Sequence, residues 1–570
     1  MDAAIPLSEY PRPQLRRDSY LCLNGQWEYA IKPKSGQPPA KYDGMITVPY
    51  SPECKLSGVE RVLLPSQHLW YRRTFTLPEG FNKGRVLLHF GAVDQQAVVY
   101  VNDARAVRHE GGYTPFSADI TKLLKEGENV LAVRVRDRSD RTYISHGKQK
   151  LHSGGMWYTP QSGIWQTVWL ESVPESYIFS IRMTPVPDES VLKLTVFTAD
   201  DGNCTLELEG RTHELPTNRP NAVKIEKPHL WSPDDPYLTP IKIRYGDDEV
   251  ESYFGLRKLS IEPDEDGHKR LCLNGKPLFR TGLLDQGYYP DGMYTPRDDT
   301  TMIHDIMTAK TLGFNMLRKH VKIEPLRWYY HCDRLGMLVW QDMVNGGRGY
   351  RPTVIQLPLL TDRSTSDSQY HRFGRGDEEG RKQFIVELDE MIDTLYNCVC
   401  IELWSIFNEG WGQFDAEKLT EHVRMKDRRR FIDHASGWHD QGAGDILSRH
   451  VYFKPYTHEE DELGRACTLT EFGGYTLRAD GHTFSERTFG YKKFADSSEL
   501  SAAIKRLYED EIIPAKSEGL CACVYTQLAD VEDELNGLLT YDREVLKTEA
   551  ETMRRLNAQL IGDQPPADRK

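Results

Sequence analysis

The change in hydrophobic period near residue 263 constrains the fold of this chain more than any other feature. Before this point, short segments alternate apolar and polar residues between turns such as Asn102-Asp103, a pattern typical of β-sandwiches. After it, strand-like apolar runs alternate with helical patterns, giving about eight strands over roughly 300 residues. This size and alternation predict a (β/α)8 TIM barrel.

A chain of 570 residues is longer than one hydrophobic core usually supports, so several domains are expected. We predict a jelly-roll β-sandwich over 1–177, an immunoglobulin-like β-sandwich over 178–262, a barrel over 263–560 and a tail over 561–570. The barrel strands are expected at 278–283, 314–320, 337–340, 400–407, 430–434, 446–452, 468–472 and 521–526. The clearest barrel helices are expected at 299–312, 325–335, 378–396 and 498–516.

The composition excludes several classes of protein. A net charge of −13 argues against a nucleic-acid partner, and no apolar run reaches the length that spans a membrane. The ten cysteines lie mostly in apolar stretches, and the start at Met1 lacks the basic and apolar regions of a secretory signal. These features predict buried, reduced thiols and a cytoplasmic location.

Two apolar runs, 401–410 and 467–474, each end in a glutamate that glycine closely follows: Glu409 and Glu471. Both runs are expected to be buried strands, the fourth and seventh of the barrel. The carboxyl ends of barrel strands carry catalytic groups, and two carboxylates at one point are what cleavage of a glycosidic bond needs. A lone glutamate would more often form a surface ion pair, but the pair together indicates an enzyme.

The motifs around this pair resemble a known family. Trp-Ser-Ile-Phe-Asn-Glu-Gly at 404–410 is similar to the acid/base motif of the family 2 glycoside hydrolases, which include β-galactosidases, β-glucuronidases and β-mannosidases. Leu-Thr-Glu-Phe-Gly at 469–473 is similar to the nucleophile motif of that family. Further resemblances lie at 23–27, 162–165, 273–279 and 315–320, in the family's order of jelly roll, immunoglobulin-like domain and barrel.

The resemblance implies a role for each matching residue. Glu409 would be the acid/base and Glu471 the nucleophile of a retaining mechanism. Asn408 would bind the sugar 2-hydroxyl, Tyr452 would orient the nucleophile, and His320 would bind the sugar. A packed tyrosine at the barrel rim and a buried core histidine remain the plain alternatives for the last two.

Six more residues are expected around the sugar. Arg318 would form an ion pair with the nucleophile and keep it charged. The others are expected to contact substrate, although packing alone is an equal alternative for the tryptophans: Asp285, Gln286, Trp157, Trp438 and Tyr525. Asp285 and Gln286 stand where the family has an Arg-His-Glu sequence, and Tyr525 lies near the end of the eighth strand.

Departures from the family pattern narrow the chemistry. The stretch 340–346 lacks the Glu-x-His pair of metal-dependent β-galactosidases, so we expect no metal and no other cofactor. Glu534 and Asn536 occupy the stretch where β-glucuronidases have an Asn-x-Lys pair. A carboxylate repels the carboxylate of a uronic acid, so glucuronides are disfavoured. Segment 344–376, rich in Gly, Arg and Ser, is expected to be either a lid or disordered.

The leading hypothesis is therefore a retaining exo-β-glycosidase, with β-galactosides as the default substrate. Another β-linked sugar, namely a galacturonide, glucuronide, mannoside, fucoside or arabinoside, is the alternative within enzymes. A catalytically silent carbohydrate-binding protein is the alternative from another class. The expected partner is an oligosaccharide or small glycoside, without nucleic acid or membrane, and a homo-oligomer stays open.

Overall fold

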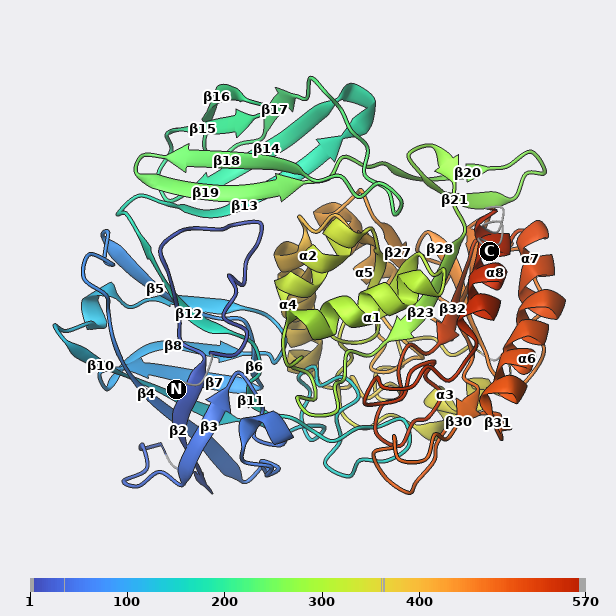
Figure 1. Cartoon of the computed structure of the whole chain (residues 1–570), viewed down its shortest axis with the longest axis horizontal. Coiled ribbons are helices and arrows are strands. Elements are labelled where there is room, and N and C mark those ends of the chain that lie inside the picture. Colours follow the sequence, from blue (N-terminus) through green and yellow to red (C-terminus); the bar gives the residue numbers. More distant parts are fainter. Residues whose placement is uncertain (1–4, 35, 360, 362–363, 563–570) are drawn as a thin grey trace, which may run out of the picture.

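The computed structural model describes residues 5–562 except 35, 360, 362 and 363. It contains a sandwich at the N-terminus, a second smaller sandwich and a barrel (Figure 1). The predicted tail 561–570 lies, from residue 563 on, outside the described residues. Among the described helices, none is both long and apolar enough to cross a bilayer.

The N-terminal sandwich is built from the first twelve strands. These are β1 (Tyr20–Cys22), β2 (Gly25–Pro33), β3 (Gly44–Val48), β4 (Gln67–Thr76), β5 (Arg85–Phe90), β6 (Val93–Asp94), β7 (Gln96–Val101), β8 (Ala104–Glu110), β9 (Phe116–Asp119), β10 (Glu128–Arg136), β11 (Gly163–Ile164) and β12 (Val168–Val173). Short 3-10 turns lie at η1 (Lys55–Ser57) and η2 (Thr121–Leu123). One sheet has the order β1-β12-β5-β9 and the other β3-β2-β4-β10-β7-β8, with the pair β11-β6 beside them.

Strict alternation explains why these segments form a sandwich. In β10, Leu131, Val133 and Val135 are fully buried, whereas the residues between them are partly exposed. Because successive side chains of a strand point to opposite faces, this pattern gives each sheet one apolar face. The two apolar faces pack against each other and form the core of the sandwich.

The second sandwich follows directly. Its strands are β13 (Ile178–Val186), β14 (Val191–Thr198), β15 (Asn203–Leu208), β16 (Arg211–Pro216), β17 (Asn221–Lys224), β18 (Thr239–Tyr245) and β19 (Asp248–Phe254), with the turn η3 (Pro187–Glu189). Two antiparallel sheets, β13-β14-β17 and β16-β15-β18-β19, enclose an aliphatic core. Short antiparallel sheets packed face to face are the immunoglobulin-like arrangement that the sequence predicts.

Eight parallel strands form the barrel. In chain order they are β23 (Arg280–Asp285), β24 (Met316–Lys319), β25 (Leu338–Asp342), β26 (Ile401–Ser405), β27 (Phe431–Asp433), β28 (Ile446–Val451), β29 (Ala466–Gly473) and β32 (Ala522–Thr526). Their order in the sheet, β27-β26-β25-β24-β23-β32-β29-β28, leaves β27 and β28 at the edges. Asp445, just before β28, joins these edges because its backbone N–H donates to the Ile432 carbonyl at 2.8 Å. The predicted barrel is confirmed.

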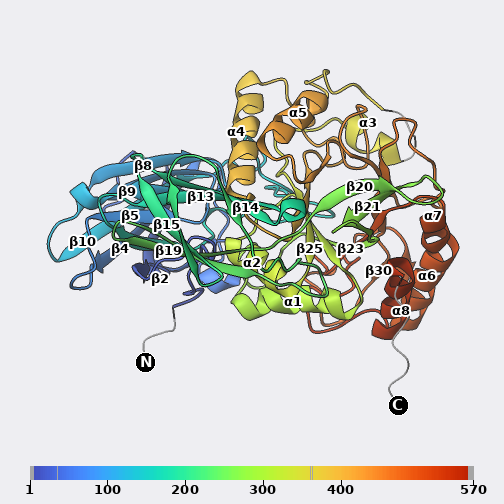
Figure 2. The same cartoon turned by 90° about the horizontal axis from the view of Figure 1, so that it is seen from above.

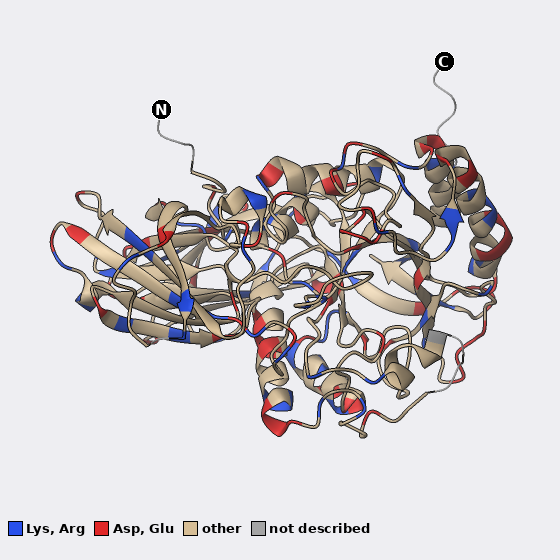
Figure 3. Ribbon diagram, turned by 90° about the horizontal axis from the view of Figure 1, so that it is seen from below, with Lys and Arg blue, Asp and Glu red and all other residues tan. Residues whose placement is uncertain are grey.

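Helices surround these strands (Figure 2). They are α1 (Asp299–Thr311), α2 (Leu326–Leu335), α3 (Pro352–Ile355), η4 (Leu357–Leu359), α4 (Glu378–Leu395), α5 (Ala416–Lys426), α6 (Ser497–Leu507), η5 (Tyr508–Ile512), α7 (Ile513–Ser517) and α8 (Ala550–Ile561). The remaining strands are β20 (Leu259–Pro263), β21 (Lys269–Leu273) and β22 (Lys276–Pro277), which form one small sheet, and the pair β30 (Thr476–Leu477) and β31 (Lys493–Phe494). Acidic and basic residues are interspersed over both sandwich and barrel ribbons (Figure 3).

A segment of the first sandwich, residues 143–161, reaches the mouth of the barrel. Ser145 forms an antiparallel bridge with Gly346, and the backbone N–H groups of His146 and Gly147 donate to the Asn345 carbonyl at 3.0 and 3.1 Å. The cyan loop lies among the loops below the barrel in Figure 1. We call residues 143–161 the mouth segment, because it brings side chains of another domain to the carboxyl ends of the barrel strands.

Candidate active site

Glu409 lies beyond the end of β26, in a tight turn over the barrel mouth. Its φ of +50° is in the left-handed region, which non-glycine residues seldom occupy. The backbone N–H of Glu409 donates to the Ser436 carbonyl at 2.9 Å, and this bond holds the turn against the loop after β27. Such strain is typical of functional sites. The side chain is 6% exposed.

Glu471 belongs to β29 and lies opposite, held by two neighbours. The guanidinium of Arg318, on β24, donates to Glu471 Oε1 at 3.0 Å, and the Tyr452 hydroxyl donates to Oε2. Burial would raise the pKa of Glu471, but the His450 imidazole and the Arg318 guanidinium outweigh burial and lower it to about 2. Glu471 is therefore a carboxylate at neutral pH.

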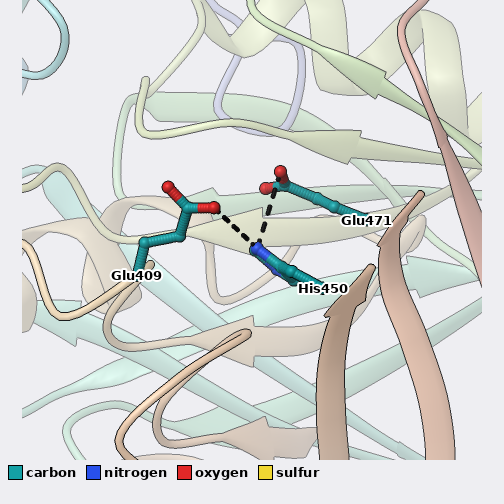
Figure 4. A group of neighbouring side chains, drawn as sticks. All are labelled: Glu409, His450 and Glu471. Atoms are coloured by element: carbon teal, nitrogen blue, oxygen red, sulfur yellow. Dashed lines mark hydrogen bonds and ion pairs between the residues drawn. The ribbon is translucent and has the colours of Figure 1, made fainter. Parts of the chain in front are cut away.

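His450, on β28, lies between the two carboxylates (Figure 4). Its Nδ1 is 3.0 Å from Glu409 Oε1 and 3.6 Å from Glu471 Oε2. Its Nε2 is 3.3 Å from an amino nitrogen of Arg318. Because a guanidinium only donates hydrogen bonds, Nε2 must accept, and the proton of the neutral ring lies on Nδ1. His450 therefore donates to Glu409 Oε1.

The two glutamates have opposite electrostatic environments. Burial raises the pKa of Glu409, the hydrogen bond from His450 opposes this rise, and the charge of Glu471 adds to it. One carboxyl is thus held towards the protonated form while the other is held ionised, the arrangement that separates an acid from a nucleophile. An oxygen of each and a ring nitrogen of His450 all lie within 4.8 Å of one another.

The same three residues offer donor atoms that a metal ion accepts. However, Nδ1 of His450 carries the ring proton, and Arg318 and Tyr452 each donate to one oxygen of Glu471. This donor set fits proton transfer better than metal coordination. The absence of a metal stays a prediction from the sequence.

Arg318 organises the floor of the site. Its Nε donates to Asp342 Oδ1 at 3.0 Å, and one amino group donates to Asn408 Oδ1 at 2.7 Å. The amide nitrogen of Asn408 is buried without a hydrogen-bond partner among the described residues. Since the oxygen of Asn408 is occupied, its N–H groups are available to an acceptor on a substrate.

His320 follows β24 and presents a bare nitrogen. Its Nδ1 lies 2.9 Å from Asp342 Oδ2, and a carboxylate only accepts, so Nδ1 carries the proton. Burial and the nearby charge of Lys148 lower the pKa of His320 to about 4. The ring is therefore neutral at pH 7, and Nε2 can accept a hydrogen bond from a hydroxyl.

Aromatic rings surround this polar floor. Trp157, on the mouth segment, is half-buried and packs on Trp411 with ring centroids 5.2 Å apart. Trp438 lies edge-on to His450 at 6.2 Å. Tyr491 stacks on Tyr452 at 4.0 Å. The sequence predicts Trp157 and Trp438 near the sugar, and the structure brings both to residues of the barrel mouth.

Asp285 and Gln286, at the end of β23, differ in whether their side chains keep a hydrogen-bond acceptor without a protein partner. Asp285 accepts from the Lys319 ammonium at 2.7 Å and from the Gly287 N–H at 2.9 Å, so both of its oxygens have protein partners. Gln286 donates to the Tyr158 hydroxyl at 2.7 Å, whereas its buried Oε1 has no partner among the described residues. Of the two, Gln286 keeps an atom for substrate.

Tyr525 requires a correction. The sequence places it in the sugar site, but its ring is fully buried in the layer between strands and helices, 5.6 Å from the Phe472 ring. Alternation along β32 explains the difference, because its neighbour Thr526 faces the other side of the strand. Thr526 is the residue that reaches the site, with its hydroxyl 2.9 Å from the Tyr452 hydroxyl.

Also missed by the sequence analysis were Asp342, His450 and Lys148. Period-two spacing could have identified His450, because it lies two residues before Tyr452 in the run 446–452 that the sequence predicts as a strand, and is therefore expected on the same side. Asp342 ends the third strand, where catalytic groups are expected in a barrel. Lys148 belongs to another domain, and no local pattern connects it with the barrel.

Known proteins match this chain in all three domains. The sugar binding domain of the glycosyl hydrolases family 2 matches residues 61–174, a second domain of this family matches 183–257, and its TIM barrel domain matches 267–470. Two solved structures share the fold. A β-glucuronidase of Ruminococcus gnavus has a TM-score of 0.76 at 18% identity, covering 97% of this chain and 99% of that one. A galacturonate-bound β-galacturonidase of Eisenbergiella tayi has a TM-score of 0.71 at 19% identity, covering 97% and 99%.

Curated relatives are distant and longer. A putative β-glucuronidase of Formosa agariphila is 25% identical over 62% of this chain and 41% of its own length. A β-galactosidase of Thermoanaerobacter pseudethanolicus is 26% identical over 63% and 47%, respectively. The matched part of this chain thus spans less than half the length of these two relatives. The matches to all three domain types show that the chain belongs to family 2 of the glycosyl hydrolases.

Proposed function

We propose that this protein is a retaining exo-β-glycosidase that acts by double displacement. The observation that carries the proposal is the proximity of Glu409 and Glu471, with an oxygen of each within 4.8 Å of the other. Retaining enzymes hold their carboxyl groups about 5–5.5 Å apart, whereas inverting enzymes leave about 6.5–9.5 Å for a water molecule. The close pair favours direct attack by one carboxylate.

In the first step, Glu471 attacks the anomeric carbon while the bond to the leaving oxygen breaks. Glu409 gives its proton to that oxygen, so the leaving group departs as an alcohol. Because Oε1 of Glu409 accepts from His450, the transferred proton resides on Oε2. Arg318 keeps Glu471 ionised before the attack.

In the second step, Glu409 is a carboxylate and removes a proton from water as the water attacks the glycosyl-enzyme. The ester bond to Glu471 breaks, and its carboxylate returns to Arg318 and Tyr452. Two inversions at the anomeric carbon give net retention. The free N–H of Asn408 is placed to bind the sugar 2-hydroxyl, a contact that strengthens in the transition state.

The site also bears on which sugar the enzyme cleaves. From the resemblance we expect β-galactosides first, with galacturonides, glucuronides, mannosides, fucosides and arabinosides as the alternatives. A site floored by Asn408, His320 and Gln286 offers a donor and two acceptors to hydroxyl groups. A silent carbohydrate-binding protein is disfavoured because binding alone requires no pair of carboxyl groups with opposed pKa shifts.

A panel of 4-nitrophenyl β-glycosides with the purified protein tests this function. We expect release of nitrophenol from at least one β-glycoside, with the matching α-glycosides inert. The Glu471→Gln variant should lose this activity by roughly 10⁴-fold or more. Absence of turnover on the whole panel, with the protein shown to be folded by circular dichroism, would contradict the proposal.

A further inference from the structure

Lys148 is a buried cation at the mouth of the barrel. It belongs to the mouth segment, and only 4% of its surface is exposed. Its backbone carbonyl accepts from the Tyr158 N–H at 2.9 Å, and the next residue, Gln149, donates to Asp94 Oδ2 of the sandwich at 2.9 Å. The backbone around Lys148 is therefore held to the sandwich by Gln149, and the residues just before it are held to the barrel by their bonds to Asn345.

The ammonium of Lys148 has no polar partner within the part of the chain that the structure describes. No carboxylate there lies within 4 Å of Nζ, and no hydrogen bond from Nζ is formed. Its neighbours are two aromatic rings, Tyr158 and Trp411, with centroids 5.5 and 5.6 Å away. An ammonium largely removed from water is stabilised by a counter-charge or acceptors, and two rings at this distance give only a weak cation–π attraction.

The charge of Lys148 acts on residues of the catalytic site. Its charge is among the causes that lower the pKa of His320 and that oppose the raised pKa of Glu409. Trp411 connects the two places directly, since its ring is 5.9 Å from the His320 ring. Lys148 thus lies close enough to act electrostatically on both His320 and Glu409, although it comes from a different domain.

The carboxylate that could have neutralised Lys148 is occupied elsewhere. Glu534 accepts from the Tyr158 hydroxyl through Oε2 and from the Asn536 amide through Oε1 at 3.0 Å. Glu534 is itself only 3% exposed. Tyr158 therefore stands between cation and carboxylate, with its hydroxyl on Glu534 and its ring towards Lys148. An incoming anion meets a free positive charge on the Lys148 side of this tyrosine.

We propose that Lys148 binds a negatively charged substituent on the sugar, so that acidic β-glycosides are the preferred substrates. The group is an oxyanion, either the carboxylate of a uronide or a sulfate ester, because both accept several hydrogen bonds from one ammonium. Because little of Lys148 is exposed, it is reached only by the part of the substrate that enters the barrel mouth, which for an exo-acting enzyme is the terminal sugar. The inference rests on the proposed function and refines its substrate.

Matched pairs of substrates test the proposal. The 4-nitrophenyl β-galactoside is compared with its galacturonide and its 6-sulfate, and the β-glucoside with its glucuronide. We expect kcat/KM for at least one acidic member to exceed that of its neutral partner by about 10- to 100-fold, the usual gain from a hydrogen bond to a charged group. Comparison of the galacturonide with the 6-sulfate then shows whether the site prefers a carboxylate or a sulfate ester. A neutral member that is preferred in every pair would overturn the inference.

Variants assign the preference to this lysine. Lys148→Met removes the charge at similar volume and should lower the acidic-to-neutral ratio of kcat/KM by about tenfold or more, whereas Lys148→Arg should keep most of it. Lys150→Met is the matched control. Lys150 lies on the same segment with its Nζ 3.7 Å from the Trp157 ring centroid, and its loss should leave the ratio unchanged. An equal loss on acidic and neutral substrates in Lys148→Met would indicate a structural role and overturn the assignment.

A binding measurement separates failure of this inference from failure of the proposed function. Calorimetry with the Glu471→Gln protein compares methyl β-galacturonide with methyl β-galactoside, and requires no turnover. Tighter binding of the uronide, lost in the Lys148→Met double variant, would support the anion site even if the catalytic assignment failed. Equal binding of both glycosides, together with equal binding of the 6-sulfate, would overturn the anion site even in an active enzyme.

Discussion

The Nδ1 atom of His450 lies 3.0 Å from Oε1 of Glu409. This contact connects the proposed acid/base to β28, and Tyr452, directly after this strand, donates to Glu471. On its other side, Nε2 of His450 accepts from Arg318, the cation paired with Glu471. A change in the charge of either carboxyl should therefore change the pKa of the other, because both contact the same imidazole ring or its partner Arg318.

Loss of His450 should move the pH profile of kcat/KM. Glu409 must be protonated for the first step, so kcat/KM falls as the pH rises through the pKa of Glu409. His450 stabilises the ionised form of Glu409 and lowers its pKa. In His450→Leu this pKa rises, and the alkaline limb should move to higher pH by about one unit. The acid limb should also move upward, because His450 lowers the pKa of Glu471.

The His450→Asn variant is the control for this experiment. An amide nitrogen near the position of Nδ1 can still donate to Glu409, so its pH profile should lie closer to that of the wild type. A His450→Leu enzyme that loses activity with both limbs unchanged would show that His450 serves packing alone.

The Glu409→Gln variant should discriminate between leaving groups. A methyl glycoside needs a proton on its leaving oxygen, and its kcat/KM should fall by about 10²- to 10⁴-fold. A 2,4-dinitrophenyl glycoside leaves without protonation, so its kcat/KM should stay near that of the wild type. Its kcat should fall because water lacks a base, and azide should restore turnover. Equal losses on both substrates would contradict the acid/base role.

A buried ion pair at the opposite end of the barrel should be important for stability. Arg280 donates to Glu402 through Nε and an amino group at 3.1 and 2.8 Å, and neither side chain is exposed. Glu402→Gln leaves the guanidinium without its counter-charge and should lower the free energy of unfolding by about 3–5 kcal/mol. Urea denaturation measures this loss.

Glu28→Gln is the matched control, because Glu28 pairs with Arg72 while both side chains remain more than a third exposed. It should cost at most about 1 kcal/mol, since solvent screens exposed pairs. If the two variants lost equal stability, the buried pair would have no special role.

The barrel and its catalytic pair were predictable because their signal is local. Apolar runs that end at Glu409 and Glu471 mark strand ends, and strand ends in a parallel barrel converge. The helix α5 was not predicted, because it buries only Ala416, Leu419, Thr420 and Val423 within a run rich in charged residues. Such a weak apolar stripe becomes stable by packing on the barrel rather than by its own periodicity.

Other parts of the site depend on tertiary structure. The sequence shows that β32 ends near Tyr525, but the facing of Tyr525 and Thr526 follows from the register of the strand in the barrel. A shift of one residue would exchange their positions. Lys148 reaches the site only because the mouth segment pairs with Asn345 and Gly346, a contact between two domains that no periodicity in either one encodes.

The covalent intermediate on Glu471 is tested most directly by mass spectrometry of the protein after reaction with a 2-deoxy-2-fluoro β-glycoside that bears a dinitrophenyl leaving group. The sugar of this reagent is the one that the nitrophenyl glycoside panel identifies. Fluorine slows both steps, and the activated leaving group lets the glycosyl-enzyme accumulate. We expect one added fluoro-sugar per chain, located by peptide mapping on Glu471. Turnover without any adduct, or an adduct on a residue other than Glu471, would contradict the double displacement proposed here.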